Sequence, residues 1–496
     1  MGNVPACRVP VTPSLEALLN PELFKKEPLF TSPLKPPQKG EKVHLLSEED
    51  VNAIRKLRGA VVDLHPGMGG VTPDKLIAMI KSGIRLTSID YMMTRGCNFE
   101  CTWCFAGSGP LQKEYLPFQK LASITQEAAK LGVTLFILTG GEPLVYRDPA
   151  LGQQKGIGDH FFRVVKMIRD TYSQQGLSAK ILTFDDVALI SPEIAKRFAE
   201  YEIGLCTKGD TLAPELQDYK VNQVGAFDKM QRGYKNLVDA GYGRDPRLRV
   251  VVNSVLDHTT FDGMLDLHLW VMENGFDHSI VPVHYCGNAE NEDQEAGVHS
   301  PHVKVLYDVL SEIDRKRFGI EWKPWSAFPY NKTCNRNRSG IHIRANGDVT
   351  ACSESPGPEL TGRYTFGNIF APGFSLEKVV KDEKLEAYRE EFKRGYGTFV
   401  CSPEVCDLYA HDLCLGGCAT RSAYSKIDIQ TGLVVKNENF HNYSEKREDP
   451  LCPAWTLLAM RQGILREGLL DNIRHRIISR STRLKDLEGM EHSIPC

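Results

Sequence analysis

The feature that most constrains the fold is a strict alternation of apolar, β-branched runs with helical patterns between Ile84 and about Arg317. The predicted strands are residues 84–94, 133–139, 179–184, 203–207, 248–256 and 278–285. The predicted helices between them are residues 118–132, 159–172, 191–201, 229–241 and 261–275. Strands separated by helices pair in parallel, so the pattern predicts an α/β fold with a partial (βα)6 TIM-type barrel. Active-site residues are then expected at the C-terminal ends of the strands.

An N-terminal extension precedes this region. Residues 1–40 are rich in proline, and we expect an extended leader that lies on the surface or is disordered. Two helical patterns follow at residues 47–59 and 72–83, each opened by a capping residue and closed by glycine. Residues 1–84 are therefore predicted to form an extension with a helical cap.

The C-terminal part of the chain changes from this alternation to hairpin signals. The sequence "GIHIRANGDVTAC" predicts two strands joined by a turn at Asn346 and Gly347. Residues 454–477 predict a final helical segment that packs back on the body. The expected division is a barrel at 85–320, a small cysteine-rich domain at 321–455 and a helical tail at 456–496.

Composition and charge exclude several classes of protein. The chain has 496 residues, of which 42% are hydrophobic and 25% charged, with a formal net charge of -3, so nothing indicates a nucleic-acid partner. The most basic stretch, Arg461–Arg483, favours a solvated helix face over a site for an anionic partner. No apolar run is long enough to span a membrane, and the N-terminus has no secretory signal pattern. We expect a cytoplasmic protein, whose 14 cysteines are metal ligands more readily than disulfides.

Three cysteines directly follow the first predicted strand. Cys97, Cys101 and Cys104 stand in "MTRGCNFECTWCFAG" with the spacing CxxxCxxC. Three thiolates on one short loop suit three irons of a 4Fe-4S cube and leave the fourth iron open for chemistry. A zinc site or buried structural cysteines are the alternatives, but zinc would need a fourth ligand close by.

The triplet and its surroundings resemble the radical S-adenosylmethionine (SAM) superfamily, from about Ile89 to Cys452. The resemblance implies that SAM chelates the open iron and is cleaved reductively to a 5'-deoxyadenosyl radical, which abstracts a substrate hydrogen atom. Trp103 occupies the aromatic position of the family's motif and would shield the cluster edge. The second predicted strand ends in the family's GGEP motif, which would hold the amino group of SAM through its residues Gly140, Gly141, Glu142 and Pro143.

Further polar residues lie near predicted strand ends, where the family places contacts to SAM or substrate. These are Thr183, Asp185, Asp186, Lys208 and Asn253. Residues of these types also cap helices routinely, so a structural role is an equal alternative. The family often has an Asn-Gly pair where this chain has Phe184 and Asp185, which is a departure at the third strand.

The C-terminal cysteines resemble the SPASM domain, an auxiliary iron-sulfur module of many radical SAM enzymes. Cys334 and Cys352 frame Gly347 with intervals of twelve and four residues. The resemblance implies one auxiliary 4Fe-4S cluster on Cys401, Cys406, Cys414 and Cys452. It implies another on Cys334, Cys352 and Cys418, whose fourth ligand is missing or comes from Cys286 or a non-cysteine residue. Two zinc-ribbon sites are the alternative.

Four cysteines fall outside these motifs. Cys7 and Cys496 are terminal and are interpreted as incidental. Cys206 and Cys286 lie at the ends of predicted strands, where a thiol would be able to return a hydrogen atom to a substrate radical. Either is also an ordinary small buried residue. His284 and Tyr285, beside Cys286, are candidates for acid, base or substrate contact, with packing as the alternative.

The resemblance implies a radical SAM oxidoreductase whose auxiliary clusters accept an electron from the substrate radical. The expected reaction is dehydrogenation or cross-linking of a small polar metabolite such as a sugar, cyclitol or nucleoside, because residues 1–84 lack a three-stranded peptide-recognition pattern. A peptide-modifying maturase is one alternative, and a redox-neutral epimerase that uses Cys206 or Cys286 is another. The expected partner is an external one-electron donor of the flavodoxin or ferredoxin type. An iron-sulfur carrier or structural zinc protein would not need the GGEP strand end.

Overall fold

The computed structural model describes residues 26–37, 42–57, 86–322, 324, 339–354, 365–393, 400–410, 418–438 and 448–484. Within them a nine-stranded sheet has the order β6-β5-β4-β3-β2-β1-β7-β8-β9. Its strands are β1 (Ser88–Met92), β2 (Leu135–Thr139), β3 (Lys180–Asp185), β4 (Gly204–Lys208), β5 (Val250–Leu256), β6 (Asp277–Pro282), β7 (Gly340–Ile343), β8 (Asp348–Thr350) and β9 (Thr365–Asn368).

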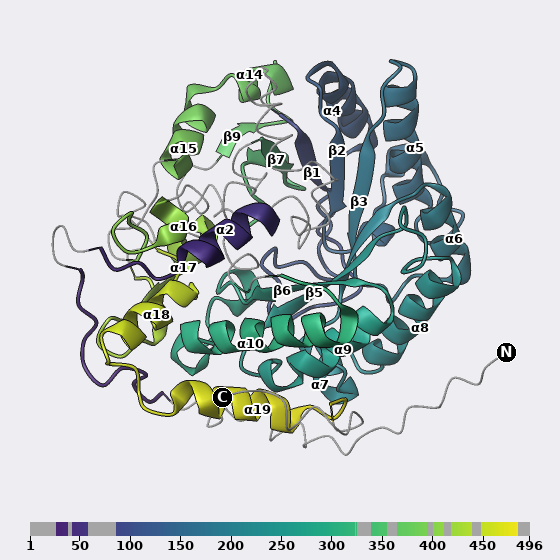
Figure 1. Cartoon of the computed structure of the whole chain (residues 1–496). Helices are drawn as coiled ribbons and strands as arrows, with labels where there is room; N and C mark the ends of the chain where they lie inside the picture. Colours follow the sequence, from purple (N-terminus) through teal and green to yellow (C-terminus); the bar gives the residue numbers. More distant parts are fainter. Residues whose placement is uncertain are drawn as a thin grey trace.

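Strands β1 to β6 form the predicted parallel core. Neighbouring strands pair in parallel throughout, and each of the predicted runs overlaps with one of these strands. Crossover segments cover the outer side of the curved sheet (Figure 1). They comprise α4 (Phe118–Lys130), η3 (Pro143–Val145), η4 (Pro149–Leu151), α5 (Asp159–Ser173), α6 (Pro192–Glu200), α7 (Pro214–Lys220), α8 (Ala226–Asp239), η5 (Phe261–Gly263) and α9 (Met264–Glu273). The prediction of an α/β partial barrel is confirmed.

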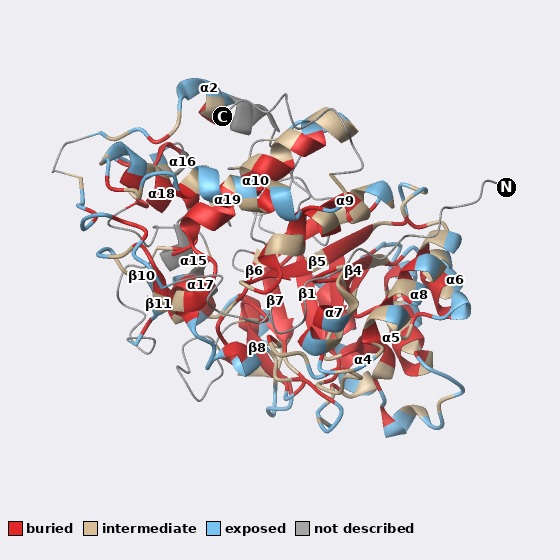
Figure 2. Cartoon of the chain, turned by 90° about the horizontal axis from the view of Figure 1, so that it is seen from below, coloured by how far each residue is buried: buried red, intermediate tan, exposed pale blue. Residues whose placement is uncertain are grey.

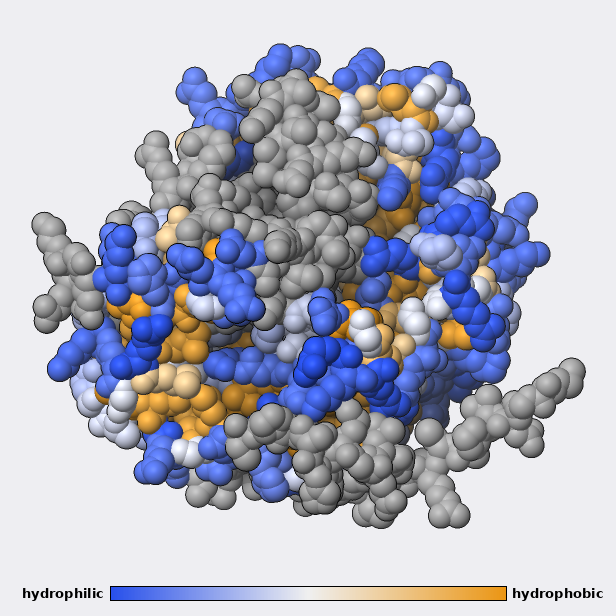
Figure 3. Space-filling model, in the orientation of Figure 1, coloured by the Kyte–Doolittle hydropathy of each residue, from blue (hydrophilic) through white to orange (hydrophobic). Residues whose placement is uncertain are grey.

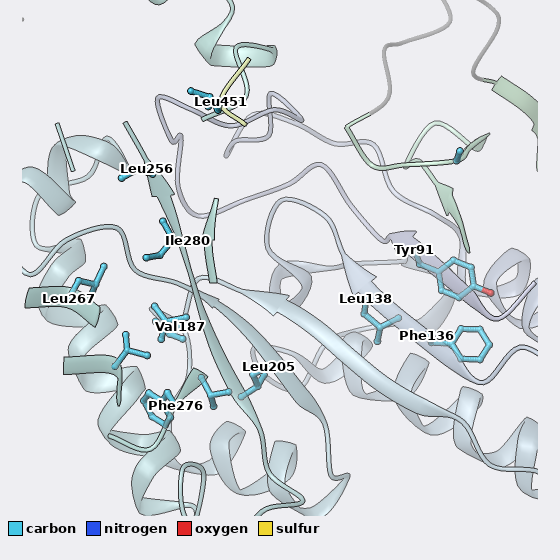
Figure 4. Packing of buried hydrophobic residues seen from close by; sticks show 14 of the residues in the cluster. Tyr91, Phe136, Leu138, Val187, Leu205, Leu256, Leu267, Phe276, Ile280 and Leu451 are labelled. Atoms are coloured by element: carbon cyan, nitrogen blue, oxygen red, sulfur yellow. The ribbon is translucent and has the colours of Figure 1, made fainter. Parts of the chain in front are cut away.

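The two faces of the sheet differ because side chains alternate along each strand. Ile89 and Tyr91 belong to the large core that includes the helices, whereas Asp90 lies on the opposite, inner face. Figure 4 shows Tyr91 and Phe136 within this large core, where their ring centroids are 5.7 Å apart. Figure 2 shows the strands as almost continuously buried. The inner face is therefore buried as well, and the residues on it are the candidates for contact with a substrate.

The predicted hairpin at Asn346 and Gly347 is confirmed, but it does not stand apart from the barrel. β7 and β8 are antiparallel, and the N–H of Gly347 donates to the carbonyl of Arg344 at 2.8 Å. β7 also pairs in parallel with β1, with Ser88 opposite Gly340. The hairpin therefore continues the barrel sheet beyond β1, and the boundary expected at residue 320 does not interrupt the hydrogen-bonded sheet.

The remaining helices and strands lie outside the nine-stranded sheet. They are η6 (Gly287–Ala289), η7 (Gln294–Ala296), α10 (Ser300–Ile313), η8 (Asp314–Phe318), α14 (Leu376–Val380), α15 (Glu383–Lys393), α16 (Asp407–Ala410), α17 (Ala419–Tyr424), β10 (Ser425–Ile427), β11 (Val434–Lys436), α18 (Pro453–Arg461) and α19 (Leu469–Arg480). The predicted final helix is thus two helices, interrupted at Gly463 and Gly468, both of which have positive φ. Both pack on α10, as expected of a tail that returns to the body.

The described part of the leader, residues 26–37, lies on the surface as expected, but it places three side chains in the core. Leu29, Phe30 and Leu34 are buried in the core. The N–H of Leu29 donates to the carbonyl of Thr431 at 2.7 Å, and Leu34 makes a similar bond to Ile429 at 2.8 Å. Proline-rich sequence was compatible with this outcome, because an extended segment needs no internal hydrogen bonds if a neighbour supplies them.

The first helix of the predicted cap is present as α2 (Glu48–Leu57). Its start follows the expected capping pattern, since the N–H of Asp50 donates to the hydroxyl of Ser47 at 3.1 Å. The second predicted helix, residues 72–83, lies outside the described residues.

Several arginines of the basic tail are paired with acidic residues of this chain while they stay partly exposed, so the predicted solvated face also carries ion pairs. Arg474 lies 2.6 Å from Glu312, and Arg476 binds both carboxylate oxygens of Asp262 at 2.6 and 3.0 Å. Arg466 and Arg483 pair with Glu27 and Glu273. These partners are distant in sequence, so the arginines attach the tail to the barrel.

The surface in Figure 3 is mainly hydrophilic where it is coloured, with smaller hydrophobic areas between. Within the described segments, no helix is both long enough and apolar enough to cross a membrane.

One buried histidine makes the junction between α10 and β11 sensitive to pH. Nδ1 of His299 accepts the N–H of Val434 at 3.1 Å, and Nε2 lies 3.1 Å from the carbonyl of Glu295. Burial lowers the pKa of His299 to about 4, so the neutral ring is the folded form. The contribution of the neutral His299 ring to the free energy of unfolding is complete above the ordinary histidine pKa of about 6.5. As the pH falls toward 4 this contribution is lost, by up to about 3 kcal/mol.

We expect His299→Gln to flatten this part of the pH dependence, because an amide also accepts from Val434 and donates to Glu295 without titrating. Urea unfolding of wild type and variant at a series of pH values between 7 and 4 measures the difference. Parallel curves for the two proteins would show that His299 does not carry the effect.

Candidate active site

The cysteine triplet lies on the loop that follows β1, at the C-terminal edge of the sheet where it was expected. Cys97, Cys101 and Cys104 are half-buried free thiols. The N–H of Phe99 donates to Sγ of Cys97 and that of Ser108 to Sγ of Cys104, both at 3.4 Å. Burial raises the pKa of the Cys97 and Cys101 thiols, so a bound metal is what would keep them ionised. These features fit an iron-sulfur cluster.

Two glycines allow the end of β2 to lie directly against this loop. A Cβ on Gly140 would lie 2.4 Å from the carbonyl oxygen of Thr94, and one on Gly141 would lie 2.2 Å from that of Gly96. The N–H of Gly141 donates to Thr94 at 2.7 Å, and that of Glu142 donates to Gly96 at 2.9 Å. Because neither residue has a side chain, the GGEP turn can lie directly against the cysteine loop, and the two hydrogen bonds hold it there.

Glu142, Asp185 and Asp186 form a buried group of carboxyls at the ends of β2 and β3, with oxygens within 4.8 Å of one another. Glu142 accepts the backbone N–H groups of Leu144 at 2.8 Å and Asp186 at 3.0 Å. Burial raises the pKa of Glu142 well above its ordinary value, that of Asp185 to about 8 and that of Asp186 to about 6. A positively charged ligand would relieve the repulsion within this group.

Trp103 and Lys208 form one wall of the site. The ring of Trp103 is buried against Val255, Val283 and Tyr285. Nζ of Lys208, at the end of β4, lies 4.3 Å from the ring centroid, which is a cation-π contact. Tyr285 packs with Trp103 in this cluster.

The other predicted strand-end residues lie in different environments. Asn253, on β5, is half-buried and stands opposite Lys208 on the same face of the sheet. Thr183 is completely buried, and its hydroxyl donates to the carbonyl of Leu138 at 3.0 Å. Because Leu138 is on the helix-covered face, the interpretation of Thr183 as a contact to SAM is wrong for this arrangement. Pro143 begins the short helix η3 and is buried.

The two candidate hydrogen donors are in separate places. Cys206 is buried on the inner face of β4, in a small apolar cluster with Leu135, Ile137 and Leu182. Cys286 follows β6, and its thiol lies within electrostatic range of Cys104 and of cysteines in the C-terminal region. Cys286 is therefore placed between the triplet loop and the C-terminal cysteines.

The described C-terminal cysteines occur in segments that contact one another. Cys352, Cys401 and Cys406 are buried, whereas Cys418 and Cys452 are half-buried. Cys334, Cys414, Cys7 and Cys496 lie outside the described residues. A carboxylate oxygen of Asp449 accepts the N–H of Cys418 at 3.1 Å, and the carbonyl of the same residue accepts the N–H of Cys452 at 3.1 Å. Asp449 thus joins two of the segments that were expected to bind clusters.

Residues 91–293 match the family model of the radical SAM superfamily. Residues 91–293 are a radical SAM domain. The matched residues contain the triplet loop, the glycine contacts and the carboxyl group described above, and this family uses a 4Fe-4S cluster together with SAM.

Relatives of the radical SAM enzyme include proteins with two different activities. The mycofactocin maturase MftC of Mycolicibacterium smegmatis is 23% identical over 350 residues, which cover 69% of this chain and 80% of the relative. The probable GTP 3',8-cyclase of Sulfurisphaera tokodaii is 22% identical over 327 residues, or 63% of this chain and 92% of the relative.

Solved structures support the radical SAM fold. SuiB of Streptococcus suis bound to S-adenosylmethionine has a TM-score of 0.50 at 17% identity, covering 70% of this chain and 77% of SuiB. The protein anSMEcpe with bound AdoMet has a TM-score of 0.51 at 14% identity, covering 79% of this chain and 99% of that one.

The structure adds two inner-face residues to the candidates in this radical SAM enzyme. Asp90 and His342 are buried neighbours on β1 and β7, with an Asp90 oxygen 3.2 Å from Nδ1 of His342. The hydroxyl of Thr139 donates to the other Asp90 oxygen at 2.7 Å. An acidic residue within an apolar strand was a visible signal for Asp90. His342 had no such signal, because the pairing of β7 with β1 was not predicted.

A buried ion pair between Lys220 and Asp257 lies next to the triplet loop. The carbonyl of Lys220, at the end of α7, accepts the N–H of Thr102 at 3.0 Å. The ammonium of the same residue pairs with Asp257, and both side chains are buried. Burial opposes the charges, but the ion pair raises the pKa of Lys220 and lowers that of Asp257 relative to their ordinary values.

We expect Lys220→Met to destabilise the fold by about 3 kcal/mol or more, because it leaves the carboxylate of Asp257 buried without its cation. Lys235→Met is the matched control, since Lys235 forms an exposed pair with Asp239 that should contribute little. Denaturant unfolding of the two variants gives the comparison. Equal losses in both would contradict a special role for the buried pair.

Proposed function

We propose that this radical SAM enzyme oxidises or cross-links a side chain of a peptide, with auxiliary iron-sulfur clusters in its C-terminal region as electron acceptors. The observation that carries the substrate class is the similarity to mycofactocin maturase, which extends over a length greater than the radical SAM domain alone. The expectation of a sugar, cyclitol or nucleoside is not supported by these relatives, although one of them is named for a nucleotide, GTP. The neighbour anSMEcpe has also been solved with a peptide bound together with AdoMet.

When bound, the cluster and SAM supply a 5'-deoxyadenosyl radical that removes a hydrogen atom from the substrate. The triplet would hold the cluster, and the carboxyl group of Glu142, Asp185 and Asp186 would face the positive charges of SAM. Asp90 and His342 would receive the proton that the substrate releases when its electron leaves. Nε2 of His342 is buried and has no hydrogen-bond partner among the described residues, which suits a base that awaits a substrate.

The electron for cleavage must come from outside the protein, because the reaction is reductive. We propose a flavodoxin or ferredoxin type donor and a reducing, cytoplasmic setting. The auxiliary clusters would then pass the substrate electron onward.

The test separates cleavage from product formation. In Cys352→Ala, we expect 5'-deoxyadenosine to form at close to the wild-type rate. Formation of the modified peptide should cease, because the electron acceptor is lost. Iron analysis and circular dichroism must show that the triplet cluster and the fold remain. Normal product formation by this variant would contradict the electron-acceptor role.

If the enzyme is instead a redox-neutral epimerase, other variants should stop turnover after SAM cleavage. Cys206→Ala or Cys286→Ala would then form 5'-deoxyadenosine without product, and wild-type product would carry solvent deuterium at the reacting carbon. Retention of product by both variants, with no deuterium, supports oxidation.

A nucleotide substrate is the second candidate, because the chain covers 92% of a probable GTP 3',8-cyclase. Peptide-sized and metabolite-sized fractions of the source cell, prepared by ultrafiltration, are compared for stimulation of 5'-deoxyadenosine formation. Stimulation confined to the peptide-sized fraction supports the maturase proposal. Stimulation by GTP, with consumption of the nucleotide, supports the cyclase.

A further inference from the structure

Three segments distant in sequence meet beside the triplet loop. His284 and Cys286 follow β6, Cys352 and Glu354 follow β8, and Cys418 immediately precedes α17. The N–H of Asn288, in η6, donates to the carbonyl of Cys104 at 3.0 Å, so the segment after β6 also touches the triplet loop. This junction is where the radical SAM domain contacts the cysteine-rich region.

The side chains at this junction form a compact set of metal-binding groups. The ligand atoms of His284, Glu354 and Cys418 all lie within 4.8 Å of one another. An oxygen of Glu354 is 2.6 Å from Nδ1 of His284. Cys286 lies within electrostatic range of Cys352, Cys418 and Glu354. Thiols and a carboxylate gathered in this way favour iron, since a cation offsets the cost of placing negative groups together.

The ring of His284 is held by Arg421, which engages its Nε2. Arg421 approaches Nε2 of His284 at 3.2 Å and can act solely as a donor, so Nε2 must accept. Nδ1 then carries the ring proton and faces Glu354. Arg421 is buried and pairs with Asp449 at 2.8 Å. The buried pair of Asp449 and Arg421 therefore holds the ring of His284, whose Nδ1 lies 2.6 Å from the Glu354 carboxylate without completing a hydrogen bond to it.

We propose that Glu354 supplies an oxygen ligand to an iron-sulfur cluster held by Cys352 and Cys418. This inference rests on the auxiliary clusters of the proposed function and names one of their ligands. Glu354 follows Cys352 by two residues, and its carboxylate belongs to the compact set with Cys418. Cys286 and Cys352 both lie outside that set, and we assign the oxygen ligand to Glu354 because its carboxylate lies within 4.8 Å of the Cys418 thiol. An oxygen donor at this position takes the place of the thiolate that the sequence lacks.

The experiment uses full-length protein in which the triplet is replaced by alanine, so that bound iron and spectra come from the auxiliary clusters alone. Into this background we introduce Glu354→Ala, Glu354→Cys and, as the matched control, Cys286→Ser. Each protein is reconstituted anaerobically. Iron and sulfide per chain are measured, and the electron paramagnetic resonance spectrum is recorded after reduction with dithionite.

We expect Glu354→Ala to lose one cluster's share of iron or to show an altered cluster signal. We expect Glu354→Cys to retain the iron with a changed spectrum and reduction potential, and Cys286→Ser to match the parent. The Glu354→Cys variant keeps the test informative if the alanine variant misfolds. Parent-like iron and spectra in both Glu354 variants, or loss of the cluster in Cys286→Ser, would overturn the assignment. If the parent binds no iron, the auxiliary clusters of the proposed function are contradicted as well. If the parent binds iron and the Glu354 variants match it, only the assignment of Glu354 is contradicted.

Discussion

Replacing any one of Cys97, Cys101 and Cys104 by alanine should abolish reductive cleavage of SAM. The three thiols share one loop after β1, and each would bind a different iron, so the loss of one removes the arrangement that leaves a single iron open. Backbone N–H groups already donate to two of the sulfurs, which shows how closely the loop is shaped around them. The measurement is 5'-deoxyadenosine formed under strict anaerobiosis with dithionite.

Cys206→Ala is the control for the triplet variants, because Cys206 lies in an apolar cluster on β4 and should not affect the cleavage step. Its 5'-deoxyadenosine formation should remain near wild type. A triplet variant that still forms 5'-deoxyadenosine, in a preparation free of other iron-sulfur enzymes, would contradict the assignment of this loop.

The second large effect is expected for Gly141→Ala. Its new Cβ would lie 2.2 Å from the carbonyl oxygen of Gly96 and 2.8 Å from Cβ of Cys97, and these groups belong to the cluster loop. Because the obstacle is backbone, the loop must shift, and a shift of about 1 Å in a reacting group costs on the order of 100-fold in rate. We therefore expect SAM cleavage to fall about 100-fold while iron binding is partly kept.

Gly156→Ala is the matched control, since a Cβ at Gly156 meets nothing within 4 Å. It should leave both SAM cleavage and iron content unchanged. Rates and iron are measured side by side for the two variants. Wild-type cleavage by Gly141→Ala would mean that the GGEP turn does not have to press against the cysteine loop.

The local pattern predicted the parallel core because each strand there is a short apolar run and each crossover helix has its own periodicity. Helix α10 was missed although it is equally regular, because it follows the last strand of the alternation and begins within a polar stretch. The buried strap at Leu29 and Phe30 was missed for another reason. Their hydrogen-bond partners, Thr431 and Arg466, are more than 400 residues away, and no local pattern reports such contacts.

The site shows the same division between local and distant information. The triplet and the GGEP turn are contiguous motifs and were visible in the sequence. Asp90, His342 and Glu354 acquire their environments from pairings between distant segments, and no spacing rule indicated them. Thr183 was misassigned because position near a strand end does not tell which face of the sheet a side chain occupies.

The pairing of β1 with β7 has a consequence for how the protein is made. Ser88 and Gly340 are neighbours in the sheet but are separated by 252 residues, so β1 leaves the ribosome long before its second partner exists. Until then the strand that carries the triplet has an open edge, which another chain would be able to occupy. A fragment that ends near residue 320 should therefore aggregate.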